Sequence, residues 1–340
     1  MNSNSSRKVV VTRLEDHDAL ANGFRLALEK TPGLLPATLP RQVVIKPNLC
    51  DITSWETGVT TDPRWLSILA SELRSIRPDV EIRVVESDAI SAYKSSRSCD
   101  ETLDRLGYVT AAREAGIELV NLSRSETIEI SLDGLPLPMR IPQLFLEEMY
   151  LISIANLKVH VYTRMTGILK NSLGLLPDRD ISAFHPYLSV LISRLHLLFP
   201  PDLSIIDGRI GLEGKGPIMG DPVRMDTLVV GNDALAVDET ACRLMGIRPS
   251  EVPHLRTTAA DLGRSFGSFE LAGELRPRTF AFDAERAHHP IQIKFASRRF
   301  HRRLEAFSNR WIDRAFRLRR QPLSFAKSAL SRLAGGRRAG

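Results

Sequence analysis

The sequence predicts an α/β fold: a mostly parallel sheet with helices on both faces, built from βαβ units, with a small edge hairpin. In the first half of the chain, short apolar runs alternate with stretches of helical periodicity, which is the pattern of βαβ units. A near-continuous apolar run at residues 150–156 is typical of a strand that is buried on both faces. With 340 residues, 43% of them hydrophobic, the chain is long enough to bury a sizeable core.

The elements of the first half follow one another at short spacing. Predicted strands cover residues 9–14, 43–49, 81–85 and 117–122, and predicted helices cover residues 19–30, 65–76 and 101–115. The pair Asp62-Pro63 is suited to cap the start of the helix at 65–76. Residues 127–132 alternate with a period of two and account for the edge hairpin.

The second half continues the alternation of strands and helices. Predicted strands cover residues 150–156, 203–207 and 227–230, and predicted helices cover residues 165–173, 186–198 and 235–245. No Ser-, Pro- or Gly-rich linker divides the α/β domain at residues 8–293, which is either one unit or two lobes at about 8–148 and 149–293. Residues 1–7 are expected to form a disordered N-terminus.

The net charge of +6 is distributed unevenly. Residues 294–340 hold 14 Lys or Arg and 2 acidic residues, so this segment carries +12 and the rest of the chain −6. We expect a basic amphipathic helical tail that binds an anionic membrane surface through residues 298–338. Docking of the tail on the acidic body of the protein is the alternative, and no nucleic-acid partner is expected. The apolar stripe of the tail consists of Phe300, Leu304, Phe307, Trp311, Ala315 and Leu318.

Three cysteines, Cys50, Cys99 and Cys242, lie far apart, and none belongs to a C-x-x-C pair. This spacing excludes a zinc ribbon, a disulfide framework and an iron–sulfur cluster built from the chain's own cysteines. The first residues lack the apolar core of a signal peptide, and no stretch of about 20 residues is free of charge. The expected location is therefore cytoplasmic, or peripheral at the inner face of the membrane if the tail binds there.

Polar residues follow the predicted strand at 43–49 and form the first candidate binding segment. Lys46 and Asn48 stand near the end of this strand, and Thr61 follows in the next loop. Ligands bind at the carboxyl ends of strands in open α/β sheets, so these side chains are candidates to hold an anionic substrate. The alternatives are a lysine that reaches the solvent and a threonine that caps a helix.

The segment after residue 157 is the most informative for catalysis. His160, Lys170 and His185 stand at successive junctions between strands and helices, and Thr166 and Asn171 lie among them. Imidazole groups there could transfer protons or bind a metal, and a lysine amine could bind an anion or form a Schiff base. We expect the three to be catalytic and Thr166 and Asn171 to bind substrate, although each residue alone has a purely structural interpretation.

A third segment is rich in glycine, and a fourth is acidic. Gly214, Lys215 and Gly216 follow the strand at 203–207 and are expected to place backbone N–H groups against the ligand, unless the loop is only a turn. The spacing fits neither a dinucleotide fingerprint nor a Walker loop. Three aspartates could complete a site for a divalent metal: Asp207, Asp221 and Asp238.

These motifs, in this order, resemble the family called domain of unknown function 362. The matching residues span roughly residues 9–246 and comprise Lys46-Pro47-Asn48, Lys158-x-His160, Thr166-Gly167-x-x-Lys170-Asn171-x-x-Gly174, His185, Asp207-Gly208, Gly214-x-Gly216-Pro217, Gly220-Asp221-Pro222 and Ala236-Val237-Asp238. The resemblance implies an α/β fold. Many members of the family also carry a ferredoxin-like module, which three scattered cysteines cannot build. The order His160, Lys170, His185 is also similar to that of nickel-pincer lactate racemases, and it serves as a chemical analogy.

The leading hypothesis is an enzyme that acts on a small anionic metabolite, either a carboxylate or a phosphate. His160, Lys170 and His185 would transfer protons, and a divalent metal could assist. The alternative is a non-catalytic redox or assembly accessory protein at the membrane periphery.

Overall fold

A computed structural model describes residues 6–15, 19–88, 98–178 and 181–283. The chain divides into a unit that ends at Asp283 and a second that begins at Ala284. The predicted tail at 294–340 and most of the predicted N-terminal segment lie outside the described residues. No helix in the described part of the chain is long and apolar enough to cross a membrane.

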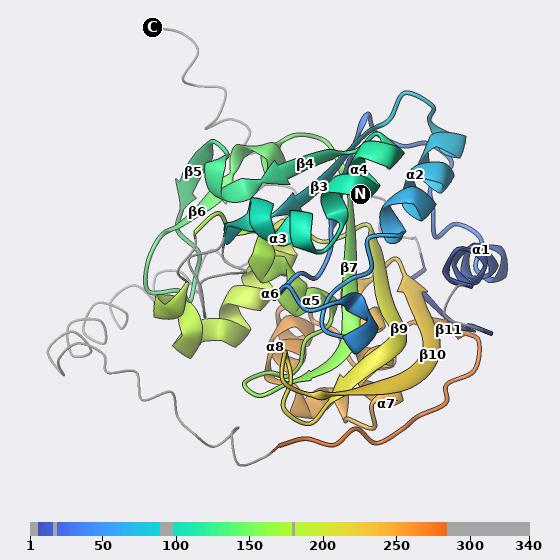
Figure 1. Ribbon diagram of the computed structural model, residues 1–340. Helices are drawn as coiled ribbons and strands as arrows, with labels where there is room; N and C mark the ends of the chain where they lie inside the picture. The colour runs from blue at the N-terminus through green and yellow to red at the C-terminus, as the bar shows by residue number, and fades with distance from the viewer. Residues whose placement is uncertain (1–5, 16–18, 89–97, 179–180, 284–340) are drawn as a thin grey trace, which may run out of the picture. The chain divides into compact units, whose positions relative to one another are not determined.

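One large sheet runs through the described unit (Figure 1). Its strands are β1 (Lys8–Arg13), β2 (Gln42–Lys46), β3 (Glu81–Glu86), β4 (Glu118–Asn121), β7 (Tyr150–His160), β9 (Leu203–Glu213), β10 (Asp221–Gly231) and β11 (Glu270–Ala272), and the short β8 (Arg164–Met165) pairs with β7. The order along the sheet is β11-β1-β10-β9-β7-β2-β3-β4. Only β10 pairs antiparallel with its two neighbours in this path, so the mostly parallel sheet is confirmed. The sheet has no break near residue 148, because β2 pairs with β7 and β1 with β10.

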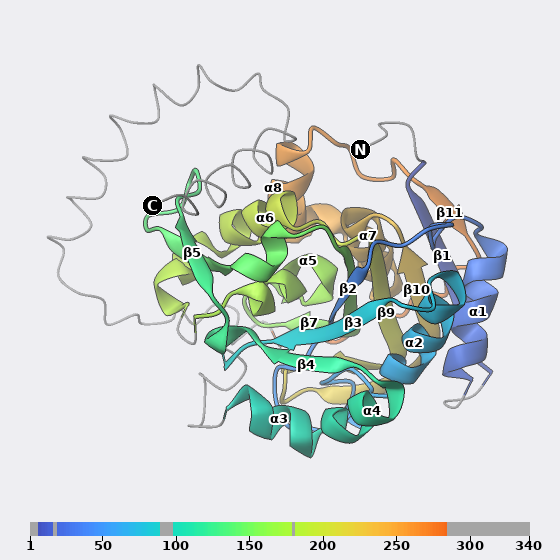
Figure 2. The same cartoon turned by 90° about the horizontal axis from the view of Figure 1, so that it is seen from above.

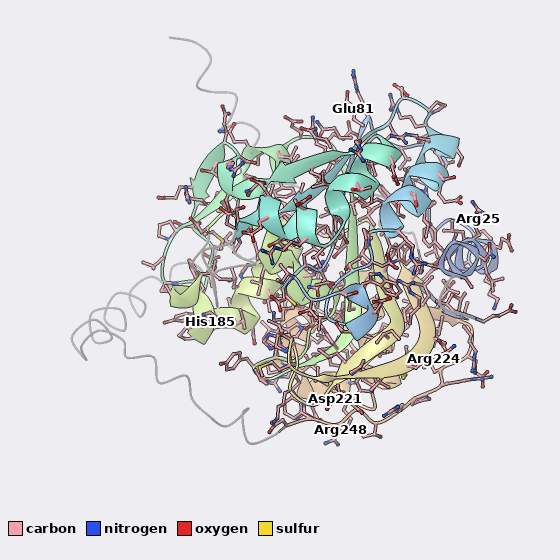
Figure 3. All side chains as sticks on the ribbon, viewed as in Figure 1. Arg25, Glu81, His185, Asp221, Arg224 and Arg248 are labelled. Carbon is pink, nitrogen blue, oxygen red and sulfur yellow. The ribbon has the colours of Figure 1, made fainter. Side chains whose placement is uncertain are left out.

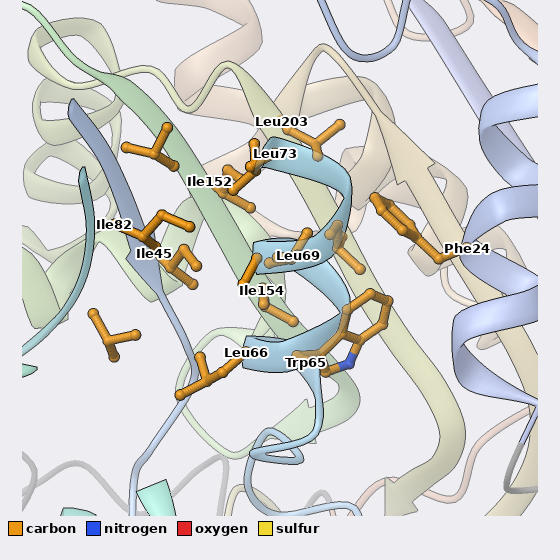
Figure 4. Close-up of a cluster of buried hydrophobic side chains, with 14 of the residues drawn as sticks. Phe24, Ile45, Trp65, Leu66, Leu69, Leu73, Ile82, Ile152, Ile154 and Leu203 are labelled. Atoms are coloured by element: carbon orange, nitrogen blue, oxygen red, sulfur yellow. The ribbon is translucent and has the colours of Figure 1, made fainter. Parts of the chain in front are cut away.

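Helices cover both faces of the sheet, as Figure 2 shows from above. The helices are α1 (Leu20–Lys30), α2 (Trp65–Ile76), α3 (Cys99–Arg105), α4 (Tyr108–Ala115), α5 (Gly167–Asn171), α6 (Leu188–Leu198), α7 (Ala234–Leu244) and α8 (Pro253–Asp261). The first four bury their apolar sides in one core, which includes Trp65 of α2 and Phe24 of α1 (Figure 4). The rings of these two residues meet edge to face at 5.5 Å. The last four pack against the opposite face, together with odd-numbered residues of β7 such as Leu157 and Val159.

Three elements differ from the sequence prediction for local reasons. The predicted helix at 101–115 is divided into α3 and α4 because Gly107 adopts a φ of 80°. The predicted hairpin forms from β5 (Thr127–Ile130) and β6 (Met139–Pro142), but these strands make a separate two-stranded sheet. The predicted loop after Asp207 is instead a strand, and β9 continues to Glu213. A Cβ at Gly208 would approach the carbonyl oxygen of Thr227 on β10 to 2.8 Å, so glycine here allows close strand pairing.

Candidate active site

The candidate site lies at the carboxyl ends of β2 and β7, which are parallel neighbours near the middle of the sheet. Lys46 ends β2 and aligns with Ser153, so β7 extends beyond β2 as far as His160. Two further elements follow this end of β7: α5 carries Lys170, and the 3-10 helix η6 (Ser182–Tyr187) carries His185. The fold therefore brings together residues that are far apart in the sequence.

Lys46 is buried and already has a counterion. Its Nζ donates to Glu86 Oε2 at 2.5 Å and to the carbonyl oxygen of Pro47 at 2.6 Å. Burial raises the pKa of Glu86 to about 7, although the Lys46 charge opposes this shift. Gly174 permits the arrangement, because a Cβ there would lie 2.5 Å from Lys46 Cε. The predicted anion-binding lysine is thus neutralised by a carboxylate that the sequence reasoning did not identify.

The predicted binding residues Asn48, Thr61 and Asn171 form a buried hydrogen-bond network. Asn171 Nδ2 donates to the carbonyl oxygens of Lys46 and Ile154, and its Oδ1 accepts from Asn48 Nδ2 at 3.2 Å. Thr61 Oγ1 accepts from the backbone N–H of Asn48 at 2.9 Å. These bonds tie the ends of β2 and β7 together. Asn48 Oδ1 remains without a hydrogen-bond partner among the described residues.

Two further lysines lie in the cluster without a carboxylate partner among the described residues. Lys158 is fully buried, and its Nζ donates to the carbonyl oxygen of Val59 at 2.6 Å and contacts Cys50 Sγ at 3.1 Å. Lys170 has neither a hydrogen bond nor an ion pair within the described part of the chain. Burial, with a smaller contribution from the Lys158 charge, lowers the pKa of Lys170 to about 8.

His160 is buried and lies in the field of both lysines. Its Nδ1 accepts the backbone N–H of Tyr162 at 3.2 Å and that of Thr163 at 3.4 Å. Because Nδ1 is an acceptor, the neutral ring carries its proton on Nε2. Burial first, and then the charges of Lys170 and Lys158, hold the pKa of His160 well below 6.5. The imidazole is therefore neutral at pH 7.

His185 and His254 are two further imidazoles close enough to affect the titration of His160. His185 is only partly buried. His254, the second residue of α8, is fully buried, and neither of its ring nitrogens has a hydrogen-bond partner among the described residues. Burial, assisted by the charge of Lys170, lowers the pKa of His254 to about 3. The structure thus brings the three predicted catalytic residues into one cluster and adds a fourth ionisable group.

Thr166 and Asp238 lie where α5 begins. Asp238 is fully buried, and its carboxylate oxygens accept the first free N–H groups of the helix, from Ile168 at 2.6 Å and from Leu169 at 2.9 Å. Burial raises the pKa of Asp238 to about 7 despite these two bonds. Asp238 therefore caps α5 rather than facing a shared metal site. Thr166 Oγ1 is buried without a partner in the described region.

Asp207, the second predicted metal ligand, belongs to a buried charge network on β9. Arg209 Nη2 donates to Asp207 Oδ2 and to Asp62 Oδ2, both at 2.7 Å. The indole N–H of Trp65 donates to Asp207 at 2.9 Å. Since Arg209 and Trp65 already donate hydrogen bonds to the Asp207 carboxylate, this carboxylate has a structural role. The sequence reasoning missed Arg209 because it was read as part of a glycine-rich loop.

The third aspartate, Asp221, is exposed at the start of β10, and Figure 3 shows it well apart from His185. Among the described residues, no group of three or more His, Cys, Asp or Glu side chains is placed to hold a metal ion. The structure therefore does not bring Asp207, Asp221 and Asp238 together as the predicted metal site.

The glycine-rich loop connects β9 to β10 and packs against the backbone of β7. A Cβ at Gly216 would lie 2.1 Å from the carbonyl oxygen of Val159, so this glycine is needed for close packing. The N–H of Gly214 donates to the carbonyl oxygen of Ala281 at 2.8 Å. Lys215 is exposed between the two glycines. The N–H of Gly214 is therefore used within the fold, and is not available to a ligand as expected.

Four residues of the cluster were absent from the predicted site: Cys50, Glu86, Lys158 and His254. A charged residue inside the apolar run of β7 was the available signal for Lys158. Glu86 ends a predicted strand in the same way as Lys46, so the convergence of parallel strand ends could have identified it. His254 follows a proline at the start of an ordinary helix, and no sequence pattern distinguishes it.

Comparisons with known proteins find partial similarities. The structure of the lactate racemase apoprotein from Thermoanaerobacterium thermosaccharolyticum aligns with a TM-score of 0.45 and 14% identity, over 73% of this chain and 58% of that chain. A similarity at this level supports no statement about function. The thylakoid-associated protein sll1697 of Synechocystis sp. is 29% identical over 126 residues, which cover 33% of this chain and 39% of that protein. The matched segments span less than two-thirds of either protein.

The family comparison covers most of the candidate site. A family model described as domain of unknown function (DUF362) matches residues 43–243, which include the strands and helices that carry Lys46, Lys158, His160 and Lys170. The match confirms the resemblance that the motifs indicated. Because it extends over more than half of the chain, the protein belongs to the DUF362 family.

Proposed function

We propose that this protein is an enzyme that binds a small carboxylate or phosphate at the cluster and transfers a proton to or from it. One observation carries the proposal: the fully buried Lys158 and the partly buried Lys170 lie close together, and neither has a carboxylate partner among the described residues. Buried charges in proteins are normally paired, because an isolated ion loses most of its hydration energy. An anionic ligand would supply the missing negative charge.

The residues around the lysines suit proton transfer. His160 is a neutral imidazole with its proton on Nε2, so it can donate that proton or, after losing it to a ligand, take one back. Lys170 has a pKa of about 8 and therefore exists in both protonation states near neutral pH. His185 lies near enough to His160 to share in this exchange.

Thermal unfolding with small anions tests the proposal. The melting temperature of the full-length protein is measured with pyruvate, lactate and inorganic phosphate, in parallel with Lys170→Met and the control Lys30→Met. Lys30 is an exposed lysine at the end of α1. We expect at least one anion to stabilise the wild type and the control, and to stabilise Lys170→Met much less. Equal stabilisation of all three proteins, or of none, would contradict the proposal. Elemental analysis of the same preparation tests whether a divalent metal takes part.

A second candidate function, a peripheral membrane role, follows from the relative named for its thylakoid association and from the charge of residues 294–340. A basic segment of this kind gains about 1 kcal/mol for each Lys or Arg near an anionic leaflet. Full-length protein should pellet with anionic vesicles at low salt and dissociate at high salt, and a chain truncated after residue 296 should stay in the supernatant. Full-length protein that remains in solution with the vesicles would exclude this role.

A further inference from the structure

We propose that Lys170 is a nucleophile that forms an imine with the carbonyl carbon of a 2-oxo carboxylate, whose carboxylate group binds to Lys158. This inference rests on the proposed function and specifies the substrate class of the same site. The geometry that supports it is the unequal way in which the fold holds three neighbouring lysines.

Two of the three lysines donate hydrogen bonds to acceptors within the fold. Lys46 is held by Glu86 at 2.5 Å, in an ion pair that leaves no net charge. Lys158 donates to the carbonyl oxygen of Val59, and it has no carboxylate partner in the described region. In this proposal, the ligand's carboxylate would supply the partner that Lys158 lacks.

Lys170 is different, because no acceptor in the described region takes a hydrogen bond from its amine. It has no hydrogen-bond acceptor and no counterion, and a second ammonium group lies close to it. Burial and a neighbouring cation are the two conditions that make a lysine amine neutral and nucleophilic. The lowered pKa of Lys170, about 8, agrees with this argument from the contacts.

The proposed step needs proton transfer but no oxidant or additional reactant. The neutral amine of Lys170 attacks the carbonyl carbon, and the carbonyl oxygen takes a proton from His160 Nε2 while the nitrogen loses one. The first proton lost by the nitrogen returns to His160, which passes it to the hydroxyl oxygen of the carbinolamine. This oxygen then leaves as water while the nitrogen gives up its second proton to His160, so that a C=N bond replaces the C=O bond. Amine and 2-oxo acid thus give imine and water. His160 is neutral and can supply and recover the proton.

The class of substrate follows from the charges of the cluster. Lys158, a buried lysine without a carboxylate partner in the described region, favours a ligand with a negative charge, and an imine requires a ketone or aldehyde carbon within reach of Lys170. A 2-oxo acid carries both groups on adjacent carbons. Lys158, which is hydrogen-bonded to Val59, would bind the carboxylate, and Lys170, which has no hydrogen bond in the described region, would react with the carbonyl carbon. A phosphate ester suits this pair less well, because it has no carbonyl carbon for the amine to attack.

Reductive trapping tests the inference. The full-length protein is incubated with pyruvate, 2-oxoglutarate or phenylpyruvate in the presence of cyanoborohydride, which converts an imine into a stable secondary amine. Mass spectrometry of the intact protein and of its peptides then locates the adduct. We expect one adduct, on Lys170, with at least one of the three acids, and its suppression by excess lactate, which has the carboxylate but no carbonyl carbon.

Two variants separate this inference from the proposed function. Lys170→Arg keeps the positive charge but cannot form an imine, so we expect no adduct although the acid still raises its melting temperature. Lys30→Arg, the exposed control, should be trapped like the wild type. If an acid stabilises the wild type but no adduct forms on Lys170, or if adducts form equally on exposed lysines, the imine is excluded while the anion site stands. If no anion binds at all, both proposals fail.

Discussion

Replacing His254 by leucine should stabilise the protein, and more strongly at acidic pH. His254 is fully buried, and both of its ring nitrogens lack a partner among the described residues. An unpartnered buried polar group costs about 1–3 kcal/mol, and leucine is close to histidine in size, so we expect a gain of this order in the free energy of unfolding at pH 7. Residues that reduce stability in this way are often retained for function.

The pH dependence follows from the pKa of His254, which burial lowers from 6.5 to about 3. Between these values the unfolded chain binds a proton at this residue and the folded chain does not. Wild-type stability therefore falls as the pH drops below 6.5, by about 1.4 kcal/mol per pH unit from this residue alone. His254→Leu lacks this loss, so its advantage should be about 2 kcal/mol larger at pH 5 than at pH 7.

Urea unfolding of the wild type and His254→Leu at pH 7 and pH 5 measures both effects. Groups that titrate identically in both proteins cancel in the difference. The reasoning would be refuted if leucine destabilised the protein at both pH values by a constant amount, because His254 would then be satisfied in the folded state. If His254 also serves the proposed chemistry, the more stable variant should bind the stabilising anion less well.

Three further variants test the structural roles assigned above. Asp238→Ala removes the acceptor of two backbone N–H groups at the start of α5 and should lower the free energy of unfolding by about 2–4 kcal/mol in urea unfolding. An unchanged free energy of unfolding would mean that Asp238 does not cap the helix. Gly216→Val places a side chain against the carbonyl oxygen of Val159 and should lower the melting temperature by several degrees, through strain of about 1–3 kcal/mol. A variant as stable as the wild type would show that the loop does not pack on β7. Trp65→Phe loses the hydrogen bond to Asp207 and should cost about 1–3 kcal/mol by the same assay, whereas a neutral result would contradict the buried network.

Much of the fold was predictable from local patterns. Alternating apolar runs and helical stretches identified the parallel sheet, because hydrophobic periodicity reflects which face of each element is buried. The same patterns failed at β9, where Gly208 and Gly211 suggested a loop. In that strand the glycines accommodate neighbours that are distant in sequence: the backbone of Thr227 and the ring of Phe280. The spacing of residues along the sequence does not predict such contacts.

The candidate site was predictable to the extent that it depends on the ends of strands. His160 ends β7, Lys170 and His185 follow this strand along the chain, and a parallel sheet brings the carboxyl ends of its strands to one edge. Their mutual proximity was therefore expected from the order of elements. His254 could not be expected, since α8 reaches the cluster through its packing against α5, α6 and α7, which the sequence does not indicate.

The sequence by itself determined the fold class, the family and the residues from which a site could be built. Only the tertiary structure decided which of those residues keep an uncompensated charge. Lys46 is neutralised by Glu86 and Asp207 by Arg209, whereas Lys158 and Lys170 have no carboxylate partner among the described residues. The physical reason is that an ion pair acts over a few ångströms, so its partners depend on which strands and helices the fold places side by side.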